Sequence, residues 1–89
     1  MSDKISAMRE GGKRLGSIKS LLRSFVVVGT QFEEIEAEAQ RHIARLQCKP
    51  SFSTVSGYQW ATCVMKNEAV CHGIPHGNSV ADGDLITID

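Results

Sequence analysis

The chain has 89 residues, a length that allows one small domain with a modest hydrophobic core. Hydrophobic residues make up 42% of it and charged residues 22%, a composition that excludes a disordered or fibrous protein. The formal net charge is zero, but residues 1–25 are mainly basic and residues 67–89 contain no Lys or Arg. We expect the basic start to be a solvated helix face without a nucleic-acid partner, and the acidic end to suit cations.

The cysteines and the hydropathy pattern indicate a compartment. Cys48, Cys63 and Cys71 form an odd set without a C-x-x-C pair, and no apolar signal segment follows Met1. The sequence has no apolar run of transmembrane length. We therefore expect a cytoplasmic protein that does not associate with a membrane.

The first expected element is an amphipathic helix over residues 3–25. Its apolar residues recur at helical spacing, at Ile5, Met8, Leu15, Ile18, Leu22 and Phe25. Gly11 and Gly12 interrupt this series and lower helix propensity. They mark either a close helix contact or a weak point that the helix tolerates.

A second helix is expected after Gly29. Thr30 and Glu33 have the T-x-x-E spacing of a capping box, which predicts the start of the helix there. Lys49 and Pro50 end it. The predicted buried stripe consists of Phe32, Ile35, Ala39, Ile43 and Leu46. The side chains expected on the outer face, with favourable acid-to-base order, are Glu34, Glu38, Arg41 and Arg45.

The remainder of the chain changes from helical periodicity to strand-like composition. Residues 51–58 and 62–66 are predicted strands, and residues 69–72 the return strand of a hairpin that turns at Asn67-Glu68. Residues 73–79 have loop composition, residues 82–84 form a tight turn, and residues 85–89 form a last strand. The predicted class is α+β: two helices followed by antiparallel strands in one domain.

Asp89 is the first candidate for chemistry. Alternation along the last strand places it on the face of Leu85 and Thr87, opposite Ile86 and Ile88. If both faces are covered, the carboxylate must be paired, protonated or bound to a metal, because an isolated buried charge is costly. The alternative is a frayed chain end in water.

Cysteine and histidine side chains raise the question of a zinc site. Gly-Ile-Pro separates His72 from His76, so the two cannot share a helix face, and no paired Cys motif is present; this spacing argues against zinc. His72 suits either substrate hydrogen bonding and proton transfer or a structural role held by the backbone. A nucleophilic dyad of Cys71 and His72 is disfavoured, because neighbours on a strand point to opposite faces.

Aromatic residues near Cys63 form a further candidate site. Tyr58 and Trp60 line either an apolar pocket together with Cys63 or the protein core. Residue chemistry leaves these two alternatives open.

Two stretches resemble consecutive signature sequences of type I methionine aminopeptidases. The first is N-E-A-V-C-H-G-I-P at residues 67–75, and the second is D-G-D-L-I-T-I-D at residues 82–89. Met8-Arg9 in the long first helix, Gly29-Thr30 before the second helix and Gly57-Tyr58 before Cys63 are also similar to that family. The resemblance covers nearly the whole chain in the right order.

The resemblance implies the N-terminal half of a pita-bread fold, in which two helix-and-sheet halves surround a two-metal centre. It implies removal of the initiator methionine from nascent proteins, with action at the ribosome. In such an enzyme His72 contacts the scissile peptide, Asp89 is the first metal-ligating aspartate, and Tyr58 and Cys63 line the pocket for the methionine side chain. The implied cofactors are two divalent metal ions, and the ligand chemistry suits Co, Mn, Fe or Zn.

The chain departs from the family pattern in two respects. Between Tyr58 and Cys63 it has Q-W-A-T where the family carries a longer segment with Gly, an aromatic residue and Pro, which leaves the role of Trp60 open. The later metal ligands of the family, namely a second aspartate, a histidine and two glutamates, have no counterpart after Asp89. Because a two-metal hydrolase needs several such ligands, we expect this chain to be an N-terminal fragment that is inactive alone.

Two other hypotheses belong to different classes. One is a non-catalytic pita-bread relative that binds peptide or ribosomal partners, although the presence of both His72 and Asp89 argues against it. The other is self-association of the half fold, because an exposed sheet edge and apolar face favour pairing with another copy.

Overall fold

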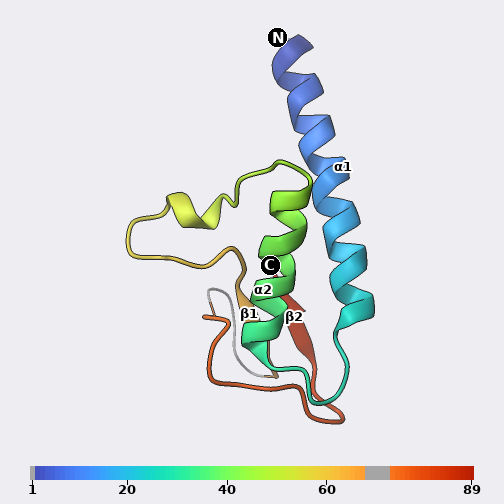
Figure 1. Ribbon diagram of the computed structural model, residues 1–89, viewed down its shortest axis with the longest axis vertical. Coiled ribbons are helices and arrows are strands. Elements are labelled where there is room, and N and C mark those ends of the chain that lie inside the picture. Colours follow the sequence, from blue (N-terminus) through green and yellow to red (C-terminus); the bar gives the residue numbers. More distant parts are fainter. Residues whose placement is uncertain (1, 68–72) are drawn as a thin grey trace.

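The computed structural model describes residues 2–67 and 73–89, without the side chains of residues 2 and 53. The element order is α1 (Ser2–Phe25), α2 (Phe32–Arg45), the short 3-10 helix η1 (Phe52–Thr54), β1 (Val64–Lys66) and β2 (Ile86–Ile88). Figure 1 shows α2 in front of the two strands and α1 alongside α2, with the first turns of α1 extending past the rest of the molecule. Neither described helix is long and apolar enough to cross a membrane.

Helix α1 confirms the expected first helix, but only its second half packs in the core. Ile18 and Leu22 are each 4% exposed, whereas Ile5, Met8 and Leu15 face solvent. The reason is visible in Figure 1, because the first turns of α1 have no neighbouring element to cover them. A Cβ added at Gly11 or Gly12 would meet nothing within 4 Å, so these glycines are tolerated and mark no close helix contact.

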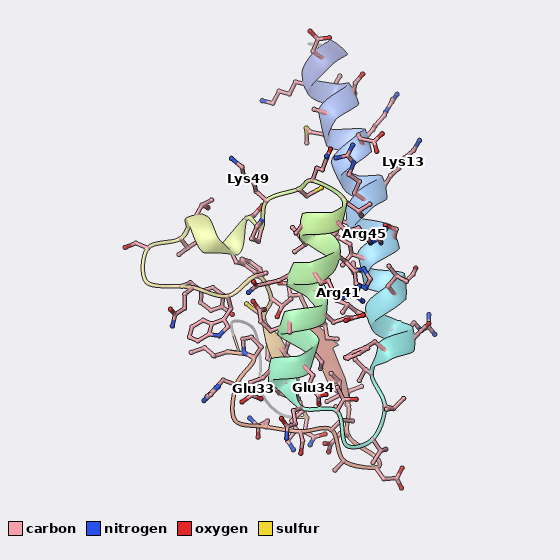
Figure 2. All side chains as sticks on the ribbon, viewed as in Figure 1. Lys13, Glu33, Glu34, Arg41, Arg45 and Lys49 are labelled. Carbon is pink, nitrogen blue, oxygen red and sulfur yellow. The ribbon has the colours of Figure 1, made fainter. Side chains whose placement is uncertain are left out.

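Helix α2 carries the predicted buried stripe. Phe32, Ile35 and Ala39 are at most 1% exposed, and Ile43 and Leu46 are partly buried against the same cluster. The acidic residues Glu33 and Glu34 lie at the start of α2 and Arg41 and Arg45 toward its end, an order that complements the helix dipole (Figure 2).

The predicted capping box at the start of α2 is wrong by one residue. The N-cap is Gln31, whose N–H donates to Oε1 of Glu34 at 2.8 Å. Thr30 is buried instead, and its hydroxyl oxygen accepts the N–H of Val27 at 3.0 Å. The hydroxyl therefore closes the turn between the helices rather than capping α2.

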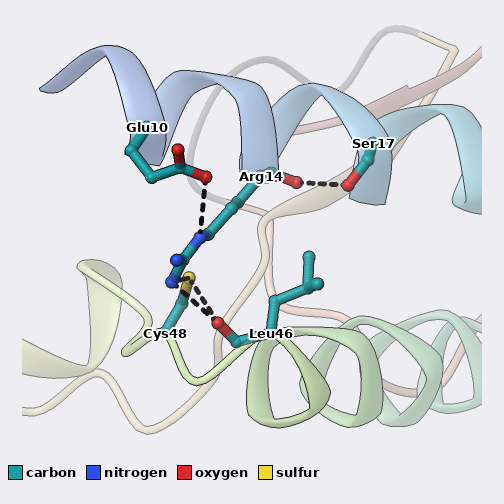
Figure 3. Close-up of polar contacts among 5 residues, drawn as sticks. All are labelled: Glu10, Arg14, Ser17, Leu46 and Cys48. Carbon is teal, nitrogen blue, oxygen red and sulfur yellow. Dashed lines mark hydrogen bonds and ion pairs between the residues drawn. The ribbon is translucent and has the colours of Figure 1, made fainter. Parts of the chain in front are cut away.

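Arg14 joins α1 to the end of α2. Its guanidinium donates to the carbonyl oxygen of Leu46 at 2.9 Å, contacts Cys48 Sγ at 3.8 Å and pairs with Glu10 at 3.2 Å (Figure 3). These contacts raise the pKa of Arg14, with the Cys48 hydrogen bond as the largest cause. A cation on α1 thus meets the negative end of the α2 helix dipole.

The strand predicted at residues 51–58 is wrong. This segment forms η1 and turns, because local hydrogen bonds compete with strand pairing. The Thr54 hydroxyl donates to the carbonyl of Ser51 at 2.6 Å, and the N–H of Tyr58 donates to the carbonyl of Val55 at 3.1 Å. Gly57 has a φ of 85°, which ends the turn in the left-handed region.

Strands β1 and β2 form an antiparallel pair in which Val64 lies opposite Ile88 and Met65 opposite Thr87. The predicted alternation of the last strand is confirmed, because Ile86 and Ile88 pack against the core while Thr87 and Asp89 are exposed. The return strand predicted at residues 69–72 lies outside the described residues.

Candidate substrate pocket

An apolar pocket of about 460 Å³ lies between η1 and the start of β1. It is lined by Phe52, Val55, Ser56, Gly57, Tyr58 and Cys63. The two pocket residues expected from the family resemblance, Tyr58 and Cys63, are therefore brought together. The Tyr58 hydroxyl lies 3.4 Å from Cys63 Sγ, and burial together with this contact raises the pKa of Tyr58.

Three aromatic side chains contact one another at the pocket, and two of them, Phe52 and Tyr58, line it. The rings of Phe52 and Tyr58 meet edge-on with their centroids 6.0 Å apart, and the rings of Tyr58 and Trp60 meet edge-on with their centroids 5.2 Å apart. Trp60 thus contacts a residue of the pocket wall and does not itself line the pocket. The sequence did not reveal Phe52 and Val55 as pocket residues, because a turn in place of the predicted strand brings them there.

Glu36 is a buried carboxylate that the sequence did not single out, and it is bonded to the two residues that precede Cys63. It lies on α2, is 7% exposed and faces the segment that leads into β1. Its oxygens accept the N–H groups of Ala61 and Thr62 at 2.7 and 3.0 Å and the Thr62 hydroxyl at 2.7 Å. The only sequence signal was a charged residue next to the buried stripe of the helix, which is too common to identify a site.

Asp89 is held to the pocket strand by its backbone. The N–H of Asp89 donates to the carbonyl of Cys63 at 2.8 Å, and the N–H of Cys63 donates back to Asp89 at 2.8 Å. Directly opposed residues of an antiparallel pair place their side chains on the same face, so Asp89 and Cys63 share one face of the sheet. The backbone is paired rather than frayed, while the side chain is exposed to solvent.

The two histidines of the sequence motif differ in what the structure shows of them. His72 lies outside the described residues. His76 is exposed, and its Nδ1 lies 3.1 Å from a carboxylate oxygen of Glu33. The same oxygen of Glu33 accepts the N–H of Gly77 at 3.1 Å, and this hydrogen bond is the main cause that lowers the pKa of Glu33. This contact ties the loop after the H-G-I-P motif to α2.

A two-metal centre does not fit the residues gathered here. Within residues 2–67 and 73–89, no three His, Cys, Asp or Glu side chains group in a way that could hold a metal ion. Asp89 offers one exposed carboxylate on the pocket side of the sheet, and one carboxylate does not make a two-metal site.

Comparisons with known proteins identify relatives of this arrangement. The chain is 33% identical to methionine aminopeptidase 1 of Bacillus subtilis over 85 residues, which cover 96% of this chain and 34% of that enzyme. It is 33% identical to a methionine aminopeptidase of Clostridium perfringens over 87 residues, which cover 98% of this chain and 35% of that enzyme. No protein-family profile matches the chain.

A solved structure agrees with the sequence relatives. The crystal structure of a methionine aminopeptidase from Thermotoga maritima matches with a TM-score of 0.82 at 31% identity, over 86% of this chain and 31% of that one. The chain spans about a third of the length of the curated relatives it matches. In sequence and in its pita-bread fold it corresponds to the N-terminal portion of a type I methionine aminopeptidase.

Proposed function

We propose that this chain forms the methionine-binding part of a methionine aminopeptidase, and that the complete protein removes the N-terminal methionine from nascent peptides. The observation that carries the proposal is the apolar pocket in which Tyr58 and Cys63 meet, in a chain related to these enzymes. A thioether side chain is apolar and polarizable, so a wall of aromatic rings and a thiol suits it.

The proposed roles of the other residues follow from the sequence motifs. Asp89 shares the sheet face of Cys63 and is proposed to be the first metal-ligating aspartate of the complete enzyme. His72 is proposed to hydrogen-bond the scissile peptide. Residues 1–89 are proposed to be the first half of the aminopeptidase domain, acting at the ribosome in the cytoplasm.

Divalent metal ions, namely Co, Mn, Fe or Zn, are proposed to act only in the complete protein. Asp89 supplies one oxygen ligand, and we assign no metal-dependent step to the described residues. We propose that the remaining ligands come from sequence beyond these 89 residues and that this chain alone is inactive. Release of methionine from a Met-Ala-Ser peptide by the purified chain with Mn²⁺ or Co²⁺ would refute this part of the proposal.

Ligand binding tests the pocket directly. Trp60 is the sole tryptophan and lies against Tyr58, so its fluorescence reports on the pocket wall. We expect titration with L-methioninamide to change this fluorescence in a saturable manner and titration with L-lysinamide to leave it unchanged, because a charged side chain is poorly accommodated in an apolar pocket. Equal responses to both amides, or none to either, would contradict the proposed pocket.

Self-association is a further part of the proposal, and it involves the outer edge of β2. The backbone of Asp89 bonds to Cys63, and the carbonyl of Leu85 accepts the N–H of Asn67 at 2.8 Å. In an antiparallel pair, residues bonded in this way alternate with residues whose N–H and C=O groups point outward. The backbone groups of Ile86 and Ile88 therefore point away from β1. In the described part of the chain nothing pairs with this edge. Sedimentation of the chain as a monomer at high concentration would contradict self-association.

A further inference from the structure

We propose that Glu36 is the positioning residue of the methionine pocket, acting through Thr62 to hold Tyr58 and Cys63 in place. This inference rests on the proposed function of the pocket. Glu36 itself does not line the pocket, so its role is to fix the wall rather than to touch a substrate.

Four hydrogen-bond donors surround the Glu36 carboxylate, and most of them come from one segment of the chain. Oε1 of Glu36 accepts both the N–H and the hydroxyl of Thr62, and Oε2 accepts the N–H of Ala61 and the side-chain amide of Gln40. Three of these four donors belong to the two residues that precede Cys63. Charge-assisted bonds of this kind offset the cost of burying a carboxylate, and they fix the position of both backbone amides.

Thr62 connects the Glu36 carboxylate to Tyr58 in the pocket wall. The carbonyl oxygen of Thr62 accepts the Tyr58 hydroxyl at 2.5 Å, and the same hydroxyl reaches Cys63 Sγ at 3.4 Å. Thr62 is therefore held from helix α2 on its amide side and holds Tyr58 on its carbonyl side. A shift of Thr62 therefore moves Tyr58 relative to Cys63, whose backbone is paired with Asp89.

The segment that carries the pocket wall has few other restraints relative to α2. Between the end of α2 and the start of β1, the described chain forms η1 and turns, with no strand pairing until Cys63. Local turns fix the shape of residues 51–58 but not their position relative to α2. The hydrogen bonds of Glu36 to Ala61 and Thr62 link the segment to α2 across 25 and 26 positions in sequence.

The Glu36→Gln variant tests this role against a matched control. The amide keeps the shape of the side chain but turns an acceptor into a donor that faces other donors, which leaves buried groups unpaired. Glu38→Gln removes the same charge from the same helix, but among the described residues the polar contacts of Glu38 are with Arg41 and His42 on α2. We expect Glu36→Gln to weaken L-methioninamide binding at least about tenfold and Glu38→Gln to change it less than about twofold.

A second measurement does not depend on ligand. Nuclear Overhauser contacts between the Tyr58 ring and the Cys63 side chain report on the wall itself, because they join the turn segment to the strand-paired Cys63. We expect them to be lost in Glu36→Gln and kept in Glu38→Gln, with the helical circular dichroism of both variants unchanged. If Glu36→Gln does not fold, Thr62→Val removes only the hydroxyl donor, and we expect it to weaken binding about threefold or more.

The outcomes separate this inference from the proposed function. If Glu36→Gln binds L-methioninamide within twofold of the wild-type affinity, the positioning role is overturned and the proposed pocket stands. The same holds for Thr62→Val if that variant has to replace Glu36→Gln. Absence of methioninamide binding to the wild-type chain would refute the proposed function instead. In that case, Tyr58–Cys63 contacts that persist in Glu36→Gln would overturn the positioning role, and their loss would support it.

Discussion

Gly73 and Val64 approach each other so closely that only glycine fits. The N–H of Val64 donates to the carbonyl of Gly73 at 2.9 Å, and a Cβ added at Gly73 would lie 2.6 Å from the carbonyl oxygen of Val64. The same Cβ would lie 2.5 Å from a side-chain carbon of Met65. The glycine of the H-G-I-P motif thus has a structural reason at this position, because a methyl group there would push against backbone as well as side chain.

Gly73→Ala is expected to destabilise the protein by roughly 1–3 kcal/mol, the usual cost of an overpacked site. Gly12→Ala is the control, because Gly12 lies in the open middle of α1, where alanine favours the helix by up to about 1 kcal/mol. Urea unfolding of both variants measures the difference. Equal stability of Gly73→Ala and the wild type would show that the two segments do not approach as closely as described.

Ile35→Ala tests the core on which the site is built. Ile35 is 0% exposed at the centre of the cluster between the helices and the strands, so we expect a loss of roughly 2–5 kcal/mol. For a domain of this size such a loss approaches the whole free energy of folding. Met8→Ala, at a position 68% exposed, is expected to cost less than about 0.5 kcal/mol. Thermal unfolding followed by circular dichroism distinguishes the two, and similar midpoints would contradict the described core.

Arg14→Met tests the link between the two helices. The variant keeps an apolar stem but loses the donors to Leu46 and Cys48, so we expect a melting temperature lower than that of the wild type. Lys13→Met removes a neighbouring exposed charge from the same helix, labelled in Figure 2, and is expected to leave the melting temperature nearly unchanged. Equal effects of the two substitutions would mean that charge alone, rather than the contact in Figure 3, is responsible.

Asp84 is expected to contribute to the loss of folding stability at acidic pH. Its carboxylate accepts the N–H of Ala81 at 2.9 Å and the amide of Asn67 at 3.1 Å, and the Ala81 hydrogen bond is the main cause that lowers the pKa of Asp84. A pKa lowered by folding gives stability that is present above the unfolded value of about 3.9 and is lost as the pH falls through the folded value.

Asp84→Asn should therefore lose less stability than the wild type between about pH 5 and about pH 2. Asp82→Asn is the control, because Asp82 lies in the same turn and makes no hydrogen bond within the described ranges. Urea midpoints measured across this range provide the comparison. An acid dependence in Asp84→Asn identical to that of the wild type would contradict the prediction.

Sequence periodicity predicted the helices because apolar residues recur at helical spacing in both, although only α2 buries its whole stripe, with Phe32, Ile35 and Ala39 at most 1% exposed. Alternation likewise predicted which side of the last strand carries Asp89. The segment around Phe52 was predicted wrongly because its β-favouring residues form turns through local hydrogen bonds. Glu36 was not predicted because its partners lie 25 and 26 positions away, a separation that no local pattern encodes.

We propose for this chain the role of the methionine-recognising portion of a methionine aminopeptidase. It is tested most directly by replacing the matching third of the Thermotoga maritima enzyme with this chain and assaying methionine release from Met-Ala-Ser with Mn²⁺ or Co²⁺. We predict activity that falls at least about a hundredfold in the Asp89→Asn variant, more than the loss of an outer-shell partner costs. A chimera that is folded and binds metal but releases no methionine, or one whose activity is unaffected by Asp89→Asn, would contradict the claim.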